Sequence, residues 1–224
     1  ITFVMLTGRT DLSAGMMLTF LATISCYFVT PGIENQLLAI VVPILLGAVG
    51  GLVNGILVGV IRLNSFVSTL GMMSLYTGFV LLFIKQSPSL FGSQDMTVYR
   101  FLGQGSILGI PTPVIILAIV AIVSSIVLRR TVYGARIYAV GSNASAARYS
   151  GISPAAIIVS VYTVSGLLTG LGAVVMCSRI LSAQPKMGSG YEFTALTAIV
   201  LGGLSIQGGK GGILGTLIGV LILG

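Results

Sequence analysis

Long apolar runs separated by short polar clusters dominate the chain. A helix that crosses the hydrocarbon core of a bilayer needs about 20 apolar residues, and on that scale the pattern predicts a set of spanning helices. They are expected at Leu12–Val29, Leu37–Ile61, Ser65–Ile84, Thr112–Leu128, Pro154–Cys177, Phe193–Ser205 and Gly212–Gly224. The sequence therefore predicts an all-α, polytopic transmembrane helix bundle in which residues 1–224 form a single domain.

Composition supports a membrane protein. Hydrophobic residues make up 55% of the chain and charged residues only 7%, whereas a soluble domain carries roughly 25% charged residues. The net charge of +7 does not indicate nucleic-acid binding, because the basic residues occupy short loops, where they set membrane orientation. The chain begins and ends inside apolar runs, so we expect a fragment truncated at both ends, with Ile1–Thr7 as the end of an earlier helix.

Lysine and arginine predict the orientation, because cytoplasmic loops carry an excess of both. Alternation of the spans places the larger basic group on the cytoplasmic side: Arg9, Arg62, Arg129, Arg130, Arg136, Arg148 and Lys210. Lys85, Arg100, Arg179 and Lys186 are then external. The external segment Lys85–Pro111 is rich in glycine and proline, so we expect it to be irregular or re-entrant.

Several kinds of chemistry are excluded by composition. The chain has no histidine, so it holds no His-ligated metal, Ser–His pair or His proton relay, and we expect no catalytic residues and no metal. Cys26 and Cys177 lie in apolar runs and are assigned no chemistry. The segment Gly202–Gly211 departs from a phosphate-binding loop, because Leu204 replaces its first glycine and Gly211 follows Lys210 in place of Ser or Thr. We expect a tight turn between helices there.

Glycine recurs at a spacing of four residues in two predicted helices. This spacing places the glycines on one helical face, where a neighbouring backbone can approach closely. The predicted packing glycines are Gly47, Gly51, Gly55 and Gly59 in one helix and Gly211, Gly215 and Gly219 in the other.

Polar residues interrupt the apolar sequence at Thr7–Gly15 and at Gly188–Thr194. Each segment places one carboxylate, Asp11 or Glu192, beside glycine and just before a helix. One interpretation is capping by Asp11 or Thr194, which the helix dipole favours. The other is that paired interruptions in two halves of a transporter mark internal repeats and a substrate pathway near their interface. Both interpretations stay open.

Residues 129–153 are too polar to span the membrane, and their pattern predicts a short cytoplasmic helix. Asn143 is a suitable N-cap, Ala144–Arg148 are good helix formers, and Gly151 is suited to end the helix before Pro154 opens the next one. Such a helix would present a rigid protruding surface to a partner protein. The alternative is a basic connector that only fixes the topology.

Five ordered segments together resemble one known family. They are Thr10–Gly15, Asn64–Gly71, Tyr133–Arg136 with Tyr138–Asn143, Ala146–Arg148, and Gly188–Glu192 followed by Val200–Ser205. In order and spacing these segments resemble the ribose/xylose-type permease family of ABC importers over essentially the whole chain. The family pattern Gly-Ile-Asp-Leu-Ser stands here as Arg9-Thr10-Asp11-Leu12-Ser13, so Arg9 is a departure.

The resemblance implies a permease subunit of the bacterial plasma (inner) membrane, embedded in lipid. The chain would supply about seven to eight spans of a subunit with about ten. The implied partners are a second permease subunit (the same chain or a close paralogue), an extracytoplasmic solute-binding protein, and a cytoplasmic ATPase subunit that binds ATP and Mg. The chain itself would be neither an enzyme nor a holder of cofactors. The implied ATPase-coupling residues are Gly134, Arg136, Asn143, Ala146, Ala147, Arg148 and Gly151.

An uncharged sugar calls for hydroxyls, amides and aromatic faces along its pathway. The candidates are Asp11, Ser13, Asn54, Phe66, Ser68, Thr69, Tyr76, Tyr191, Glu192, Thr194 and Thr197. Most of them are equally suited to hydrogen bonds between helices, worth on the order of 0.6 kcal/mol each. The sequence does not choose between a sugar, a nucleoside, a furanone or another polar solute.

Two other functions compete with the importer. An ion-coupled secondary transporter needs charged residues within the membrane to bind its coupling ion, and only Asp11 and Glu192 qualify. An intramembrane protease needs histidine, which the chain lacks.

Overall fold

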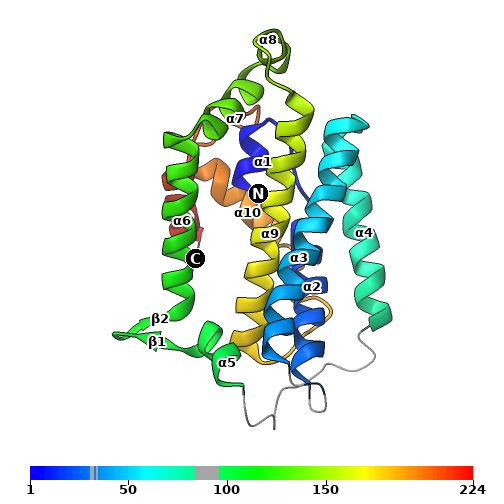
Figure 1. Cartoon of the computed structure of the whole chain (residues 1–224), viewed down its shortest axis with the longest axis vertical. Helices are drawn as coiled ribbons and strands as arrows, with labels where there is room; N and C mark the ends of the chain where they lie inside the picture. Colours follow the sequence, from blue (N-terminus) through cyan, green and yellow to red (C-terminus); the bar gives the residue numbers. More distant parts are fainter. Residues whose placement is uncertain (31–32, 34, 84–95, 224) are drawn as a thin grey trace.

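A computed structural model describes residues 1–30, 33, 35–83 and 96–223. Its long helices run along one common axis (Figure 1). They are α2 (Ala14–Val29), α3 (Gln36–Gly55) with the π-helix η1 (Ile56–Val60), α4 (Ser65–Phe83), α6 (Thr112–Arg130) and α9 (Pro154–Ile180). Three shorter helices complete the bundle: α1 (Thr2–Leu6), α10 (Tyr191–Leu201) and α11 (Ile213–Leu223).

Within the described residues, four helical segments are long and apolar enough to cross a membrane: Gln36–Val60, Ser65–Leu82, Thr112–Arg130 and Pro154–Ile180. The all-α polytopic bundle predicted from the apolar runs is confirmed. The span expected at Phe193–Ser205 is shifted, because α10 begins at Tyr191 and ends at Leu201. Gly202 follows as the C-cap, and Gly203 takes a left-handed conformation (φ 82°) that cannot continue a helix.

Helix α3 lies along α9, and glycines form the contact. A Cβ built on Gly55 would lie 2.7 Å from the Cα atom of Val159, and one built on Gly51 would overlap the carbonyl oxygen of Tyr162. Gly47 meets Gly166 in the same way, each against the backbone of the other. The two helices therefore touch backbone to backbone, which any side chain at these positions would prevent.

The second glycine series differs from its prediction in one member. Gly215 and Gly219 lie on α11 and face the backbone of Gly202 and Ala198, so they join α11 to α10. Gly211 lies outside the helix in the preceding turn, with φ 119°. The physical reason is that α11 begins only at Ile213, after a turn whose left-handed residues interrupt the helical period.

Helices α7 (Val132–Ser142) and α8 (Ala144–Tyr149) lie at one end of the bundle (Figure 1). The Asn143 side chain caps α8 by accepting hydrogen bonds from the backbone N–H groups of Ser145 and Ala146, at 3.0 and 2.9 Å. Gly151 follows in the left-handed region at φ 79°. Helix α8 thus begins and ends where the pattern predicts it, and α7 is an additional helix that Thr131 caps.

The opposite end carries α5 (Thr97–Gln104) and a hairpin of β1 (Ser106–Ile107) and β2 (Ile110–Pro111) (Figure 1). The described part of this segment is therefore ordered, so the expectation of an irregular segment was wrong for residues 97–111, while the re-entrant alternative stays a prediction. Gly109 in the left-handed region (φ 81°) allows the tight turn between the strands. Lys85, Ile84 and the rest of that segment up to residue 95 lie outside the described residues.

We expect Gly51→Ala to destabilise the bundle, because the new methyl group would force the backbones of α3 and α9 apart. Overpacking of this kind costs about 1–3 kcal/mol. Gly78→Ala is the matched control, since Gly78 lies in α4 with nothing within 4 Å of the added Cβ. Thermal unfolding in detergent, followed by size-exclusion chromatography, measures both variants. A Gly51→Ala protein as stable as the control would contradict this packing.

Candidate functional site

The helix break between α1 and α2 is the most polar buried part of the bundle. Asp11 Oδ1 accepts hydrogen bonds from the Ser13 backbone N–H at 3.0 Å and from the Ser13 hydroxyl at 2.7 Å. The Ser13 hydroxyl in turn accepts one from Asn54 Nδ2 on α3, at 2.8 Å. All three side chains are buried, with Asp11 only 1% exposed. This chain of hydrogen bonds ties the start of α2 to α3.

Helices α4 and α9 hold the same break from two other sides. The Leu12 backbone N–H donates to Thr69 Oγ1 at 3.1 Å, and the Tyr162 hydroxyl donates to the Thr10 carbonyl oxygen at 2.6 Å. Backbone groups freed by a helix break must find partners where water is absent. Sequence reasoning missed Tyr162, because α9 carries several other hydroxyl side chains and nothing in the sequence singles this one out.

Neither Asp11 nor Thr194 is an N-cap residue, whereas Glu192 does lie in the first turn of α10. Ser13, not Asp11, is the N-cap residue of α2, and no side chain caps that helix. Gly190, with φ 88°, is the N-cap residue of α10. The Thr194 hydroxyl donates to the Gly190 carbonyl oxygen at 3.2 Å, so it does not act as a capping acceptor.

The two interrupted segments lie against each other. The Gly188 backbone N–H donates to Thr19 Oγ1 on α2 at 2.9 Å, and a Cβ on Gly188 would overlap the carbonyl oxygen of Gly15. Glu192 is 1% exposed and places its carboxylate beside Gly15 in the first turn of α2. The Glu192 Oε1 atom accepts from the Gly190 N–H at 3.3 Å, whereas Oε2 has no hydrogen-bond partner among the described residues. The positive end of the α2 dipole favours a carboxylate at this position.

A third break, between α10 and α11, meets the first one. The Gly209 backbone N–H donates to the Leu6 carbonyl oxygen at 2.9 Å, and Gly8 and Gly208 pack backbone to backbone. Helix α7 lies against both breaks, since a Cβ on Gly141 would overlap the Leu6 carbonyl oxygen and lie 2.7 Å from the Gly209 nitrogen. The sequence indicated a tight turn at Gly202–Gly211 but not this contact.

A cavity of about 500 Å³ opens between α2, α9, α10 and α11. Its polar lining is made of hydroxyl groups and one carboxylate, and the rest is apolar. The polar residues are Thr2, Ser165, Thr169, Tyr191, Glu192, Thr194 and Thr216. A mostly apolar cavity of this size with a few converging polar groups is typical of a small-molecule site.

The predicted pathway residues fall into separate groups. Asp11, Ser13, Asn54 and Thr69 surround the first break, while Tyr191, Glu192 and Thr194 line the cavity. The remaining four lie elsewhere. Phe66 on α4 and Thr197 on α10 are exposed, and Tyr76 is buried and stacks on Phe20. The Ser68 hydroxyl is buried and has no hydrogen-bond partner among the residues that the structure describes.

At the α7–α8 end, buried and exposed side chains alternate. Gly134 packs against the backbone of Leu128, and Ala147 is 4% exposed within the core, whereas Arg136 and Arg148 are exposed. Tyr149 is 93% exposed at the tip of α8. Residue Ala146 is exposed too, so α8 presents one free face on a base that is fixed in the bundle.

Helix α7 is anchored to the bundle by two tyrosines. The Tyr133 hydroxyl donates to Ser160 Oγ on α9 at 2.9 Å, and the Tyr138 hydroxyl donates to the Gly211 carbonyl oxygen at 2.8 Å. Partial burial raises the pKa of Tyr133 above its usual value, an effect that the Ser160 hydrogen bond opposes. Both phenols therefore stay neutral at physiological pH and keep α7 in place.

Metal-ligating side chains do not gather anywhere in the described residues: no three His, Cys, Asp or Glu side chains lie together. Cys26 in α2 and Cys177 in α9 are buried, and neither forms a disulfide within the described residues. Thus the polar chemistry of this part of the chain consists of hydroxyls, one amide and two carboxylates inside, and arginines at the α8 end.

Comparison with known proteins matches residues 1–224 to the family described as "Branched-chain amino acid transport system / permease component". The chain is 42% identical to the ribose import permease protein RbsC of Escherichia coli (strain K12), over 100% of this chain and 70% of that protein. It is 38% identical to RbsC of Bacillus subtilis (strain 168), over 100% and 69%. Identity to the D-allose transport system permease protein AlsC of Escherichia coli (strain K12) is 36%, over 99% and 67%. No solved structure gives a significant match.

We expect Ser13→Ala to destabilise the first helix break, because the buried Asn54 amide would lose its acceptor and Asp11 one of its donors. A buried polar group left unpaired costs about 1–3 kcal/mol. Ser74→Ala is the control, since the exposed Ser74 hydroxyl bonds only to the Leu70 carbonyl oxygen of its own helix. Unfolding midpoints in detergent compare the two, and equal midpoints would show that the Ser13 hydroxyl does not hold the break.

Proposed function

The chain belongs to the branched-chain amino acid transport system / permease component family, as a sugar ABC importer permease of the ribose type, and on that basis we propose a path for the solute and an energy source for its transport. It is a multi-pass protein of the bacterial inner membrane. The proposal is that a small neutral sugar contacts the cavity between α2, α9, α10 and α11 as it crosses the membrane. A separate ATPase drives the transport cycle.

The chemistry of this cavity carries the solute part of the proposal. A sugar presents many hydroxyls and no charge, and the cavity offers hydroxyls from Ser165, Thr169 and Thr216 beside apolar walls. The unpartnered Oε2 atom of Glu192 adds an acceptor at the cavity wall. Two relatives are named for ribose and for allose, which are neutral sugars with several hydroxyl groups. Selection among such sugars belongs to an external binding protein in this proposal.

The α7–α8 unit is the proposed coupling segment for the ATPase, with Gly134, Arg136, Asn143, Ala146, Ala147, Arg148 and Gly151 as its residues. The observation that supports it is the contact of α7 with both helix breaks at Leu6 and Gly209. A rigid-body movement of α8 would pass through α7 directly to the two breaks, which adjoin the cavity. Alternating access by rocking of rigid parts around a fixed site is the general transporter mechanism that this arrangement fits.

Two further partners complete the proposal. The hairpin at the opposite end exposes Ile107, Leu108 and Ile110, with Leu108 98% exposed, and we assign this tip to contact with an extracytoplasmic solute-binding protein. A second permease subunit, either the same chain or a close paralogue, would complete the translocation path. Within the membrane the remaining apolar surface faces lipid.

An uptake assay tests the energy source. Proteoliposomes that contain the permease with its ATPase and binding protein should accumulate labelled ribose or allose only when ATP is supplied to the ATPase side. Uptake driven by an ion gradient with no ATPase present would instead establish the secondary transporter, for which Asp11 and Glu192 are the available intramembrane charges.

We expect Tyr149→Ala to weaken the association with the ATPase by about ten-fold or more, as for an exposed aromatic anchor at an interface. Stability should not change, because the Tyr149 side chain is 93% exposed. Tyr27→Ala is the matched control, since Tyr27 is 60% exposed at the opposite end of the bundle. Co-purification with the ATPase and ATP-driven uptake measure the effect, and unchanged values for both would contradict the role of α8.

The threonines of α9 provide a matched pair for the cavity. Thr169 and Thr163 both donate to the carbonyl oxygen four residues earlier, at 2.9 Å, but only Thr169 lines the cavity. We expect Thr169→Val to lower the transport rate at saturating binding protein by about two- to ten-fold, as for one lost hydrogen bond. Thr163→Val should leave it unchanged. If both variants transport at the wild-type rate, the cavity does not contact the solute.

A further inference from the structure

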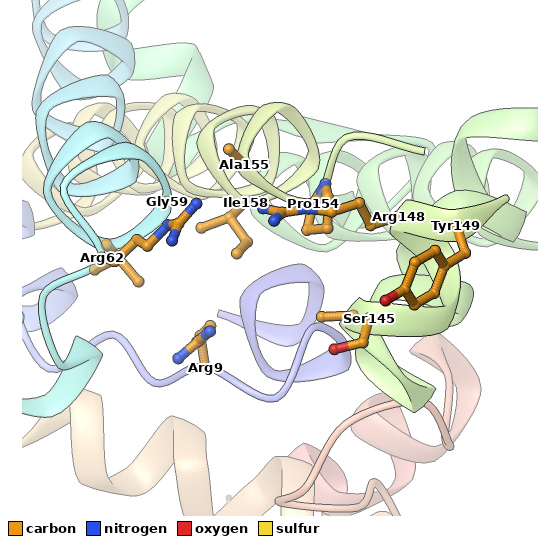
Figure 2. A pocket seen from close by; sticks show the side chains of 11 residues that line it. Arg9, Gly59, Arg62, Ser145, Arg148, Tyr149, Pro154, Ala155 and Ile158 are labelled. Atoms are coloured by element: carbon orange, nitrogen blue, oxygen red, sulfur yellow. The ribbon is translucent and has the colours of Figure 1, made fainter. Parts of the chain in front are cut away.

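A second cavity, of about 350 Å³, lies at the α8 end of the bundle and plays no part in the proposed transport path. The end of η1, the start of α9, helix α8 and the first helix break surround it. Val58, Pro154 and Ile158 supply apolar walls, while Arg9, Arg62 and Arg148 supply its charge. Figure 2 shows Arg62 and Arg148 extending toward one another across Ile158, with Arg9 on the segment facing them.

These three guanidinium groups have no partner in the part of the chain that the structure describes. None of them donates a hydrogen bond or forms an ion pair there, and neither of the two described carboxylates, Asp11 and Glu192, lines the cavity. Like charges that converge around one space repel each other, and an anion placed between them removes that repulsion. The cavity therefore has the electrostatics of an anion site.

One of these arginines has an unusual backbone conformation. Arg62 lies in the left-handed region, with φ 64°, directly after η1. A residue other than glycine is uncommon there, and such strained positions cluster at functional sites. Position and charge thus point to the same cavity.

We propose that this cavity binds a phosphate group, supplied either by the headgroup of an anionic lipid or by a soluble phosphate. Planar guanidinium groups pair with phosphate oxygens through two parallel hydrogen bonds, and three of them offer more donors than one carboxylate accepts. Apolar residues exposed next to the cavity, Val60 and Ile61, suit the acyl chains of a lipid whose headgroup enters it.

A bound phosphate joins three elements between which the described residues form no ion pair. Arg9 belongs to the first helix break, Arg62 to the segment after η1 and Arg148 to α8. Occupancy of the site therefore fixes α8 relative to the break and stabilises the cytoplasmic end of the bundle. The inference concerns binding, so it does not rest on the proposed solute or on the ATPase.

The test uses the full chain, purified without its partners. In neutral detergent, potassium phosphate is titrated against potassium chloride at equal ionic strength, and thermal unfolding is followed. In a second arm, nanodiscs of phosphatidylcholine are compared with nanodiscs that also contain phosphatidylglycerol. We expect a rise in the unfolding midpoint of roughly 2–4 °C in at least one arm.

Variants of the cavity decide whether that rise comes from this site. Arg9→Gln and Arg62→Asn should weaken the effect of phosphate or phosphatidylglycerol by about ten-fold, as expected for the loss of a charge-assisted contact. Asparagine tolerates the left-handed backbone at position 62, so this variant should fold normally. Arg130→Gln is the control, because Arg130 is exposed at the same end of the bundle and does not line the cavity.

The outcomes separate the sources and the alternatives. A response to inorganic phosphate in detergent identifies a soluble ligand, whereas a response to phosphatidylglycerol alone identifies a lipid headgroup, and both support the site. A midpoint that rises equally in the wild type and both cavity variants overturns the proposal. The absence of any rise in the unfolding midpoint in both arms also overturns it.

Discussion

Direct contact between helix backbones at glycine is the constraint on which the rest of this structure depends. Lipid offers no hydrophobic force to press helices together, so they associate by packing closely. Gly47, Gly51 and Gly55 let α3 touch α9 along its length, and Gly15 and Gly188 do the same for α2 and the turn before α10. Gly8 and Gly208 join the first and third breaks. Without these contacts the three interrupted segments would not share one region, and the cavity beside α9 would not have its walls.

The helix breaks follow from a second constraint, that a backbone group without water needs a partner. At the first break the partners of the backbone groups come from side chains on two neighbouring helices, Thr69 on α4 and Tyr162 on α9. At the third break the partner is the first break itself, through Gly209 and Leu6. Because the backbone groups of a break are hydrogen-bonded to neighbouring elements, the break moves when those elements move. Helix α7, packed on both breaks, is therefore placed to carry a displacement from α8 into the bundle interior.

The positions of the charged side chains are also related to the helix breaks. In the described residues the two carboxylates, Asp11 and Glu192, are buried at helix breaks. The end with α7 and α8 holds the larger basic group, which agrees with a cytoplasmic location. An interior with hydroxyls and few charges suits a neutral sugar better than an ion.

Much of the fold was accessible from the order of apolar runs, because a spanning helix is a local feature: its length, its charges and its capping residues all lie within the segment. Spans such as Ser65–Phe83 and Pro154–Ile180, and the capped helix after Asn143, follow from such local signals. The four-residue glycine spacing indicated a packing face, but not that α9 lies on it.

Only the tertiary structure decided which side chains meet. Asp11 and Asn54 are 43 residues apart and become linked through Ser13, and Arg9 joins Arg62 and Arg148 around one cavity. Contacts of this kind depend on how helices distant in sequence pack, and no periodicity within one helix records that.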